Sequence, residues 1–195
     1  MAKTLNNQYR IYSPREKRYP LVHDVVLKKL IVNADSRGTL VEMLKTTWTD
    51  VYDEKKLPFT QVYYSMTIPG VARDQDRWHF HPGGQVDRYV VIFGDVVFAV
   101  YDIREKSPTK DRLNLFWVGE SLGPDGQYEV LVPPRTLHGF LVVSEKPATL
   151  LNFPNKLYDP DEELRLPFAQ YPLPDGSIFS WQFVDKAFHS YAKKT

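Results

Sequence analysis

Residues 71–104 read VARDQDRWHFHPGGQVDRYVVIFGDVVFAVYDIR and carry the clearest structural signal in the chain. Two apolar, β-branched runs at 89–93 and 96–103 flank a Gly-Asp pair at 94–95. Runs of this composition on either side of a glycine-containing turn predict two neighbouring strands joined by a tight turn. We expect this pair of strands to form the centre of the fold.

Three histidines accompany predicted strands. His79 and His81 are two positions apart just before the first apolar run, and His138 lies between the turn-like residues 132–135 and an apolar run at 140–143. Side chains two positions apart on an extended backbone project from the same face. Both imidazoles should therefore point the same way, into a cavity if that face lines one.

Short apolar or β-branched runs alternate with turn-forming residues along most of the chain. Many such runs at nearly even spacing are typical of an antiparallel sandwich or barrel, so we expect an all-β fold. The predicted strands are residues 23–32, 39–44, 61–68, 89–93, 96–103, 113–120, 128–132, 140–143 and 149–153.

The remaining segments are less regular. Residues 1–20 are polar and predict an arm that is poorly fixed unless a partner covers it. Residues 46–58 have weak helical character, and residues 155–195 form an extension in which Trp181 and Phe183 suggest a late strand. No repeat or clean boundary divides the chain, so we expect one domain over residues 1–195.

Composition bounds the function. The chain has 195 residues, a net charge of +1 and no cysteine. A near-neutral charge gives no general reason to expect nucleic-acid or membrane binding, and without cysteine neither disulfides nor thiolate chemistry are available. The first twenty residues lack the apolar core of a signal peptide, and no apolar run approaches the ~20 residues of a membrane span. A cytoplasmic location is therefore expected.

One interpretation of the histidines is a metal site. His79, His81, Asp87 and His138 supply three imidazoles and a carboxylate, a set suited to a divalent transition metal. The spacing loosely resembles the first cupin motif, in which an acid and a glycine follow His-x-His. Gln85 stands nearer the usual place of the acid than Asp87 does.

A second interpretation is acid–base chemistry. A histidine of ordinary pKa accepts a proton near neutral pH, especially when a carboxylate orients it, and His79 is the candidate. Guanidinium groups suit bidentate phosphate binding. Four arginines stand at the ends of predicted strands, where they could converge at the mouth of a barrel: Arg37, Arg73, Arg88 and Arg104.

Short motifs are distributed between residues 25 and 160. They are DSRG at 35–38 followed by Glu42, Gln61 followed by Ser65, GVAR at 70–73, DIREKSPT at 102–109, Pro133 followed by HGF at 138–140, and YDP at 158–160. Together they resemble the dTDP-4-dehydrorhamnose 3,5-epimerases. The resemblance implies a cupin-type antiparallel jelly-roll barrel with N- and C-terminal extensions, usually a homodimer, that acts without a cofactor.

The resemblance also implies roles for individual residues. His79 would remove the proton next to the C4 ketone of a 4-keto-6-deoxy nucleotide sugar, and Arg88 would stand in for the family's lysine. His138 would contact the sugar, and Tyr158 would pack near the nucleotide. The nucleotide diphosphate and base would be held by Arg37, Glu42, Gln61 and Arg73.

Departures from the family pattern are equally specific. The segment that leads to His79 is three residues longer than in the family, and His81 replaces a glutamine. Counting back from Pro160 places Asn152 where the family has a proton-donating tyrosine. Tyr63 or Tyr64 could replace that acid. Asp175 and Asp185 are candidates for the carboxylate that orients His79.

Three hypotheses remain open from the sequence. The leading one is a metal-free sugar-nucleotide epimerase or isomerase. The second is a metal-dependent cupin enzyme, and His81 favours it. The third is a sugar-nucleotide-binding homologue without turnover, which Asn152 favours.

Overall fold

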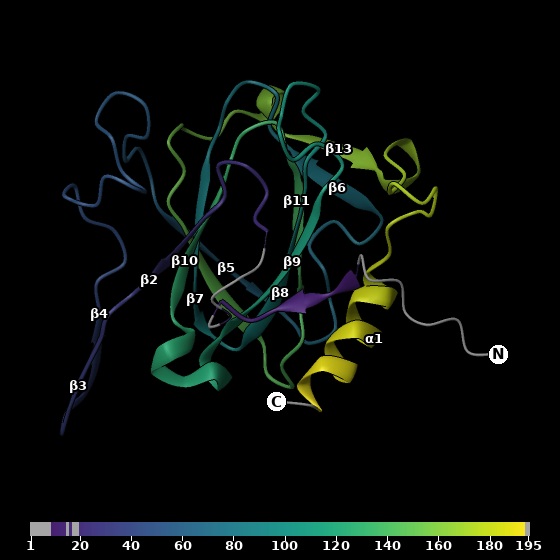
Figure 1. The fold of residues 1–195 in the computed structure, drawn as a ribbon. Helices are drawn as coiled ribbons and strands as arrows, with labels where there is room; N and C mark the ends of the chain where they lie inside the picture. The colour runs from purple at the N-terminus through teal and green to yellow at the C-terminus, as the bar shows by residue number, and fades with distance from the viewer. Residues whose placement is uncertain (1–8, 15, 17–19, 194–195) are drawn as a thin grey trace.

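A computed structural model describes residues 9–14, 16 and 20–193, and in it two sheets face each other (Figure 1). The six-stranded sheet has the order β1-β9-β8-β11-β6-β13, and the five-stranded sheet has the order β2-β10-β7-β12-β5. Strands β3 and β4 form a separate hairpin. The bounds are β1 Ile11–Tyr12, β2 Val26–Lys29, β3 Val32–Asp35, β4 Gly38–Val41, β5 Tyr63–Thr67, β6 Arg77–Phe80, β7 Asp87–Phe93, β8 Asp95–Tyr101, β9 Leu113–Gly119, β10 Tyr128–Val132, β11 Leu137–Val142, β12 Ala148–Asn152 and β13 Leu164–Pro167.

The predicted central strands are β7 and β8, joined at Gly94. This residue has φ 71°, and an added Cβ would lie 2.8 Å from the backbone of Ala148, so only glycine fits the turn. The expectation of an all-β fold is confirmed, because apart from β1 with β9 the paired strands run antiparallel.

Strand β8 is apolar after its first residue, Asp95, because both of its faces are buried. Its even-numbered side chains, from Val96 to Val100, pack in a core between the two sheets. Its odd-numbered side chains, from Val97 to Tyr101, pack in a second core with residues of the C-terminal segment. Along β8, side chains that face the core between the sheets thus alternate with side chains that face the C-terminal segment outside.

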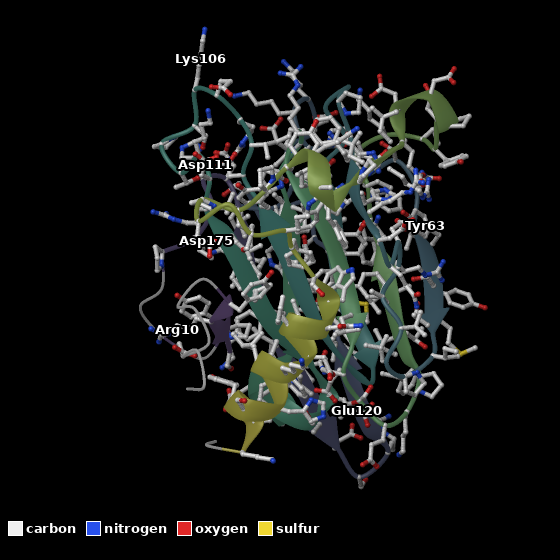
Figure 2. All side chains as sticks on the ribbon, turned by 90° about the vertical axis from the view of Figure 1, so that its right-hand side faces the viewer. Arg10, Tyr63, Lys106, Asp111, Glu120 and Asp175 are labelled. Atoms are coloured by element: carbon white, nitrogen blue, oxygen red, sulfur yellow. The ribbon has the colours of Figure 1, made fainter. Side chains whose placement is uncertain are left out.

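The C-terminal segment corrects one prediction. Trp181 and Phe183 belong to helix α1 (Trp181–Ala192) and not to a strand. The Ser180 side chain accepts a hydrogen bond from the Gln182 amide and caps the helix. Buried side chains at 181, 184, 187 and 188 follow the helical period and face the six-stranded sheet, across which α1 lies in Figure 2.

The short helices are of the 3₁₀ type: η2 (Glu120–Gly126), η3 (Pro160–Glu162) and η4 (Phe168–Gln170). The weak helical character of residues 46–58 does not produce a helix. That segment consists of turns, with a backbone bridge between Asp53 and Leu57. None of the described helices is long and apolar enough to cross a membrane.

The predicted N-terminal arm is partly fixed to the sheet. Tyr9 and Ile11 are buried, and β1 pairs in parallel with β9. The rest of this prediction, at residues 1–8, 15 and 17–19, lies outside the described residues.

Candidate active site

A cavity of about 380 Å³ opens between the two sheets. Four residues that the resemblance assigns to the site line it: Arg73, His79, His138 and Tyr158. The lining also includes six further residues with polar or ionisable side chains: Tyr63, Ser65, Asp74, Tyr89, Glu163 and Arg165. His79 on β6 is paired directly with His138 on β11, so the two imidazoles project from neighbouring strands on the interior face.

Asp74 orients His79. The Nδ1 atom of His79 lies 3.2 Å from Asp74 Oδ2, and Arg165 Nε donates to the other oxygen of this carboxylate at 2.6 Å. Burial alone would raise the pKa of Asp74, but hydrogen bonds with His79 and Arg165 lower it. An ionised carboxylate at Nδ1 holds the proton there and leaves the Nε2 lone pair available as a base.

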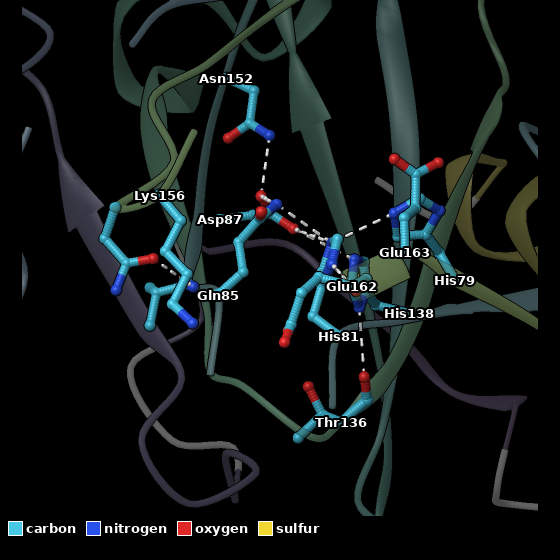
Figure 3. Close-up of polar contacts among 12 residues, drawn as sticks. His79, His81, Gln85, Asp87, Thr136, His138, Asn152, Lys156, Glu162 and Glu163 are labelled. Carbon is cyan, nitrogen blue, oxygen red and sulfur yellow. Dashed lines mark hydrogen bonds and ion pairs between the residues drawn. The ribbon is translucent and has the colours of Figure 1, made fainter. Parts of the chain in front are cut away.

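His81 and His138 also present Nε2 to the interior, because Nδ1 of each ring is held by a backbone carbonyl. His81 Nδ1 lies 3.1 Å from the Glu162 carbonyl, and His138 Nδ1 lies 3.2 Å from the Thr136 carbonyl. A carbonyl oxygen only accepts, so each Nδ1 carries the proton. Figure 3 shows the three rings converging near Asp87.

Asp87 is the buried carboxylate of this group. Gln85 and Asn152 each donate to Oδ1 at 2.9 Å, and Oδ2 lies 3.2 Å from His81 Nε2. Burial opposes ionisation, but His138 and His81 hold the pKa of Asp87 well below its usual value. Burial lowers the pKa of His138. Burial also acts to lower the pKa of His81, but the hydrogen bond and charge of Asp87, together with Glu162 and Glu163, raise it overall.

Asn152 positions Tyr63. The Arg88 amide donates to Asn152 Oδ1 at 3.1 Å, which identifies the other atom as the NH₂ group. That group donates to the Tyr63 hydroxyl oxygen at 2.7 Å. The Tyr63 oxygen is thereby an acceptor, and its own proton remains available to the cavity. Burial and the charge of Asp87 raise the pKa of Tyr63 to about 12. Tyr64, the other candidate acid, points outward and is 71% exposed.

Arg88 does not reach the cavity, which corrects its assignment as a catalytic residue. Its side chain is fully buried and donates to the carbonyls of Val51, Leu57, Pro58 and Phe153. Successive side chains of a strand face opposite sides, so Asp87 and Tyr89 face the interior while Arg88 faces the segment that covers the outside of β7.

Arg37, Glu42 and Gln61 also lie away from the cavity of their own chain. Arg37 pairs with Asp35 on the β3–β4 hairpin, which projects from the body of the molecule (Figure 1), and its side chain is 87% exposed. Glu42 pairs with Lys45, and Gln61 donates to the Lys156 carbonyl. The arginines therefore do not converge within one chain.

Arg104 fastens a loop instead of facing the cavity. Its guanidinium binds the Asp102 carboxylate, Asp24 and the His23 carbonyl. This contact explains the conspicuous DIREKSPT motif as a local structural unit, because Asp102 also accepts from Ser107 and Thr109.

The carboxylates proposed from the sequence as partners of His79 are elsewhere. Asp175 binds Ser177 and lies on the opposite side of the molecule from Tyr63 in Figure 2, and Asp185 pairs with His189 on α1. Asp74 could have been suspected from its place five residues before His79. Arg165 gives no local signal, because 91 residues separate it from Asp74 in the sequence.

The two facing sheets form a cupin-type jelly roll, and its interior cavity holds a carboxylate-oriented histidine and a tyrosine from the facing sheet. A family model described as dTDP-4-dehydrorhamnose 3,5-epimerase matches residues 21–173. The chain belongs to this family, as its motifs predicted.

Curated relatives cover most of the chain. A probable low-salt glycan biosynthesis epimerase of Haloferax volcanii is 41% identical over 152 residues, which are 76% of this chain and 90% of that protein. A spore coat polysaccharide biosynthesis protein of Bacillus subtilis is 31% identical over 151 residues, 76% of this chain and 91% of that protein. Several other relatives are epimerases, which supports an isomerase here.

Solved structures support the fold. The crystal structure of a dTDP sugar isomerase from Desulfovibrio desulfuricans superposes with a TM-score of 0.70 at 25% identity and covers 86% of this chain and 96% of that one. The prediction that epimerisation needs no cofactor is consistent with this family.

Proposed function

We propose that this protein epimerises a 4-keto-6-deoxy nucleotide sugar by removing the proton next to the C4 ketone. The observation that carries the proposal is the Arg165–Asp74–His79 chain at the cavity wall. It leaves the Nε2 lone pair of His79 as the acceptor. Removal of such a proton is feasible because the negative charge of the resulting enolate spreads onto the ketone oxygen.

Tyr63 is the proposed acid that returns the proton. It stands on β5 of the five-stranded sheet, whereas His79 stands on β6 of the six-stranded sheet, so the two groups approach a bound sugar from different sides. A pKa of about 12 keeps the hydroxyl protonated at neutral pH. In this proposal Asn152 does not transfer a proton but holds the Tyr63 oxygen.

Arg73 is the proposed contact for the diphosphate. Its guanidinium is fixed at the cavity wall by Thr67 and the Met66 carbonyl and pairs with no described carboxylate. A positive charge that is not neutralised by a neighbour is available for phosphate. His138 would contact the sugar, and Tyr158 would pack on the nucleotide at the mouth.

The remaining nucleotide contacts require a second copy of the chain. The hairpin that carries Arg37 projects away from its own cavity, and Glu42 follows it. In the proposed homodimer Arg37, Glu42 and Gln61 complete the cavity of the partner. We also expect the protein to work in the cytoplasm, where it would meet its substrate.

The test is deuterium incorporation from D₂O into a dTDP-linked 4-keto-6-deoxy sugar, followed by NMR at C3 and C5. His79→Asn should slow incorporation by about 10²–10⁴-fold while nucleotide-sugar binding changes little. His23→Asn, at an exposed position, is the matched control and should behave like the parent protein.

Tyr63→Phe separates the two proton transfers. It should retain incorporation, because His79 still removes the proton, but lose inversion, because the acid on the other side is gone. Full turnover in the His79→Asn variant would refute the base assignment. Binding without any incorporation in the unmodified protein would instead favour a binding homologue.

A further inference from the structure

The three interior histidines share one feature that the proposed reaction does not use. Each Nδ1 donates to an oxygen: the Asp74 carboxylate for His79, the Glu162 carbonyl for His81 and the Thr136 carbonyl for His138. These partners come from three separate parts of the chain and fix the same tautomer in each ring. All three Nε2 lone pairs therefore face inward.

This arrangement places acceptors close to one another, although the Gln85 side-chain amide can donate to His81 Nε2 at 3.2 Å. The Nε2 atoms of His79 and His81 are 3.1 Å apart, and His138 Nε2 lies 3.3 Å from Asp87 Oδ2. Both atoms of the second pair are buried and have no hydrogen-bond partner among the described residues. A proton on His81 would satisfy the contacts of that ring only and would leave His138 Nε2 without a donor.

Three contacts in this group have the spacing of neighbouring ligand atoms in the coordination shell of a metal ion. Ligand atoms about 2.1 Å from a metal in tetrahedral or octahedral geometry are separated by roughly 3.0–3.4 Å. The observed contacts are 3.1 Å for His79 with His81, 3.2 Å for His81 with Asp87 and 3.3 Å for His138 with Asp87. One ligating nitrogen from each histidine lies within 4.8 Å of the other two.

We propose that His79, His81 and His138 bind one divalent transition metal ion through Nε2, with Asp87 as an adjacent carboxylate ligand. Neutral imidazoles favour Zn²⁺, Co²⁺, Ni²⁺ or Fe²⁺ over the oxygen-seeking Mg²⁺ and Ca²⁺. The Nδ1 acceptors correspond to the outer hydrogen bonds that orient histidine ligands at metal centres.

Metal binding and proton abstraction are mutually exclusive at His79, because both use the same lone pair. The ion is therefore not a cofactor of epimerisation but an inhibitor that occupies the base. This consequence rests on the proposed function, whereas the metal site itself does not.

The binding test uses protein that has been freed of metal with EDTA and exchanged into metal-free buffer. Calorimetric titration with Zn²⁺ should give one ion per chain, and Co²⁺ should give visible d–d absorption that Zn²⁺ abolishes. His81→Asn and His138→Asn should each weaken binding at least about 10²-fold, and His189→Asn, on the exposed face of α1, should not change it.

Thermal unfolding without metal establishes that each variant is folded. His81→Asn and His79→Asn carry the test if His138→Asn does not fold. Absence of saturable Zn²⁺ and Co²⁺ binding, or binding that is unchanged in His81→Asn, would overturn the metal site.

The deuterium assay then tests exclusion. Zn²⁺ should abolish incorporation in the unmodified protein, and EDTA should restore it. Zn²⁺ binding that leaves incorporation unaffected would refute the base assignment of His79 and the inhibition but not the site. Incorporation that occurs only with metal would overturn the inhibitory role and make the ion a participant in the reaction.

Discussion

Among single residues, Glu129 departs furthest from its ordinary chemistry outside the cavity. It lies on β10, is fully buried, and neither carboxylate oxygen has a hydrogen-bond partner among the described residues. Burial raises the pKa of Glu129 to about 8, and the nearby charge of Arg88 only partly opposes this. The folded protein therefore favours the neutral acid.

The consequence is a stability that falls as pH rises. The pKa of Glu129 is higher in the folded chain than in the unfolded one, so its contribution is complete below about pH 4.5 and is lost as pH rises toward 8. The slope is about 1.4 kcal/mol per pH unit in that window. Glu129→Gln should remove this dependence and stabilise the protein at pH 9. Urea unfolding at pH 5 and pH 9 measures the change in the free energy of unfolding. If this free energy falls by the same amount in the parent protein and in Glu129→Gln, the assignment is contradicted.

Among the elements, β13 connects the C-terminal segment to β6, the strand that carries His79. It pairs with β6, so that Arg165 lies opposite His79 and reaches Asp74. The preceding helix η3 supplies the Glu162 carbonyl to His81. A segment that reads from the sequence as an extension thus completes the site, because it supplies partners that β6 and β11 lack.

Asp74→Asn tests this connection. The amide oxygen can still accept from His79 Nδ1, but the negative charge that favours proton uptake at Nε2 is gone. We expect kcat for deuterium incorporation to fall by about 10²-fold or more, while KM changes only a few-fold. Asp175→Asn is the matched control. A rise in KM as large as the fall in kcat, or a large fall in the unfolding temperature, would indicate a merely structural role.

For the whole molecule, the question is which chain completes each cavity. Arg73 and His79 lie in one cavity, whereas Arg37 is on a hairpin that projects elsewhere (Figure 1). In the proposed twofold dimer each hairpin would extend to the partner's cavity. The outward row formed by Tyr64, Met66 and Ile68 leaves apolar surface on and beside the edge strand β5, where a second copy could cover it.

Subunit complementation decides the point. His79→Asn and Arg37→Ala should each be nearly inactive alone. After they are unfolded and refolded together, a mixed dimer contains one cavity with both residues intact, so about a quarter of the parent activity should return. The readout is turnover of the mixture against each variant refolded alone. No recovery, with mixed dimers present, would show that Arg37 does not complete the partner's cavity.

Local pattern was sufficient for most of the strands, the Gly94 turn and the shared face of His79 and His81, because alternation and turn chemistry act over a few residues. Trp181 was misread as part of a strand, since a short aromatic pattern fits either period until its partner surface is known. Arg88 was misplaced for a related reason. A shift of one residue along a strand reverses the face, and the resemblance could not fix the register.

The sequence by itself determined the all-β architecture, the family and the histidines of the interior. Only the tertiary structure decided which groups serve them: Asp74 and Arg165 for His79, and Asn152 for Tyr63. The physical reason is that alternation along a strand is encoded locally, whereas the partner of a buried polar group can come from a segment that is distant in the sequence. The packing of whole sheets determines which distant segments meet, and no local pattern specifies it.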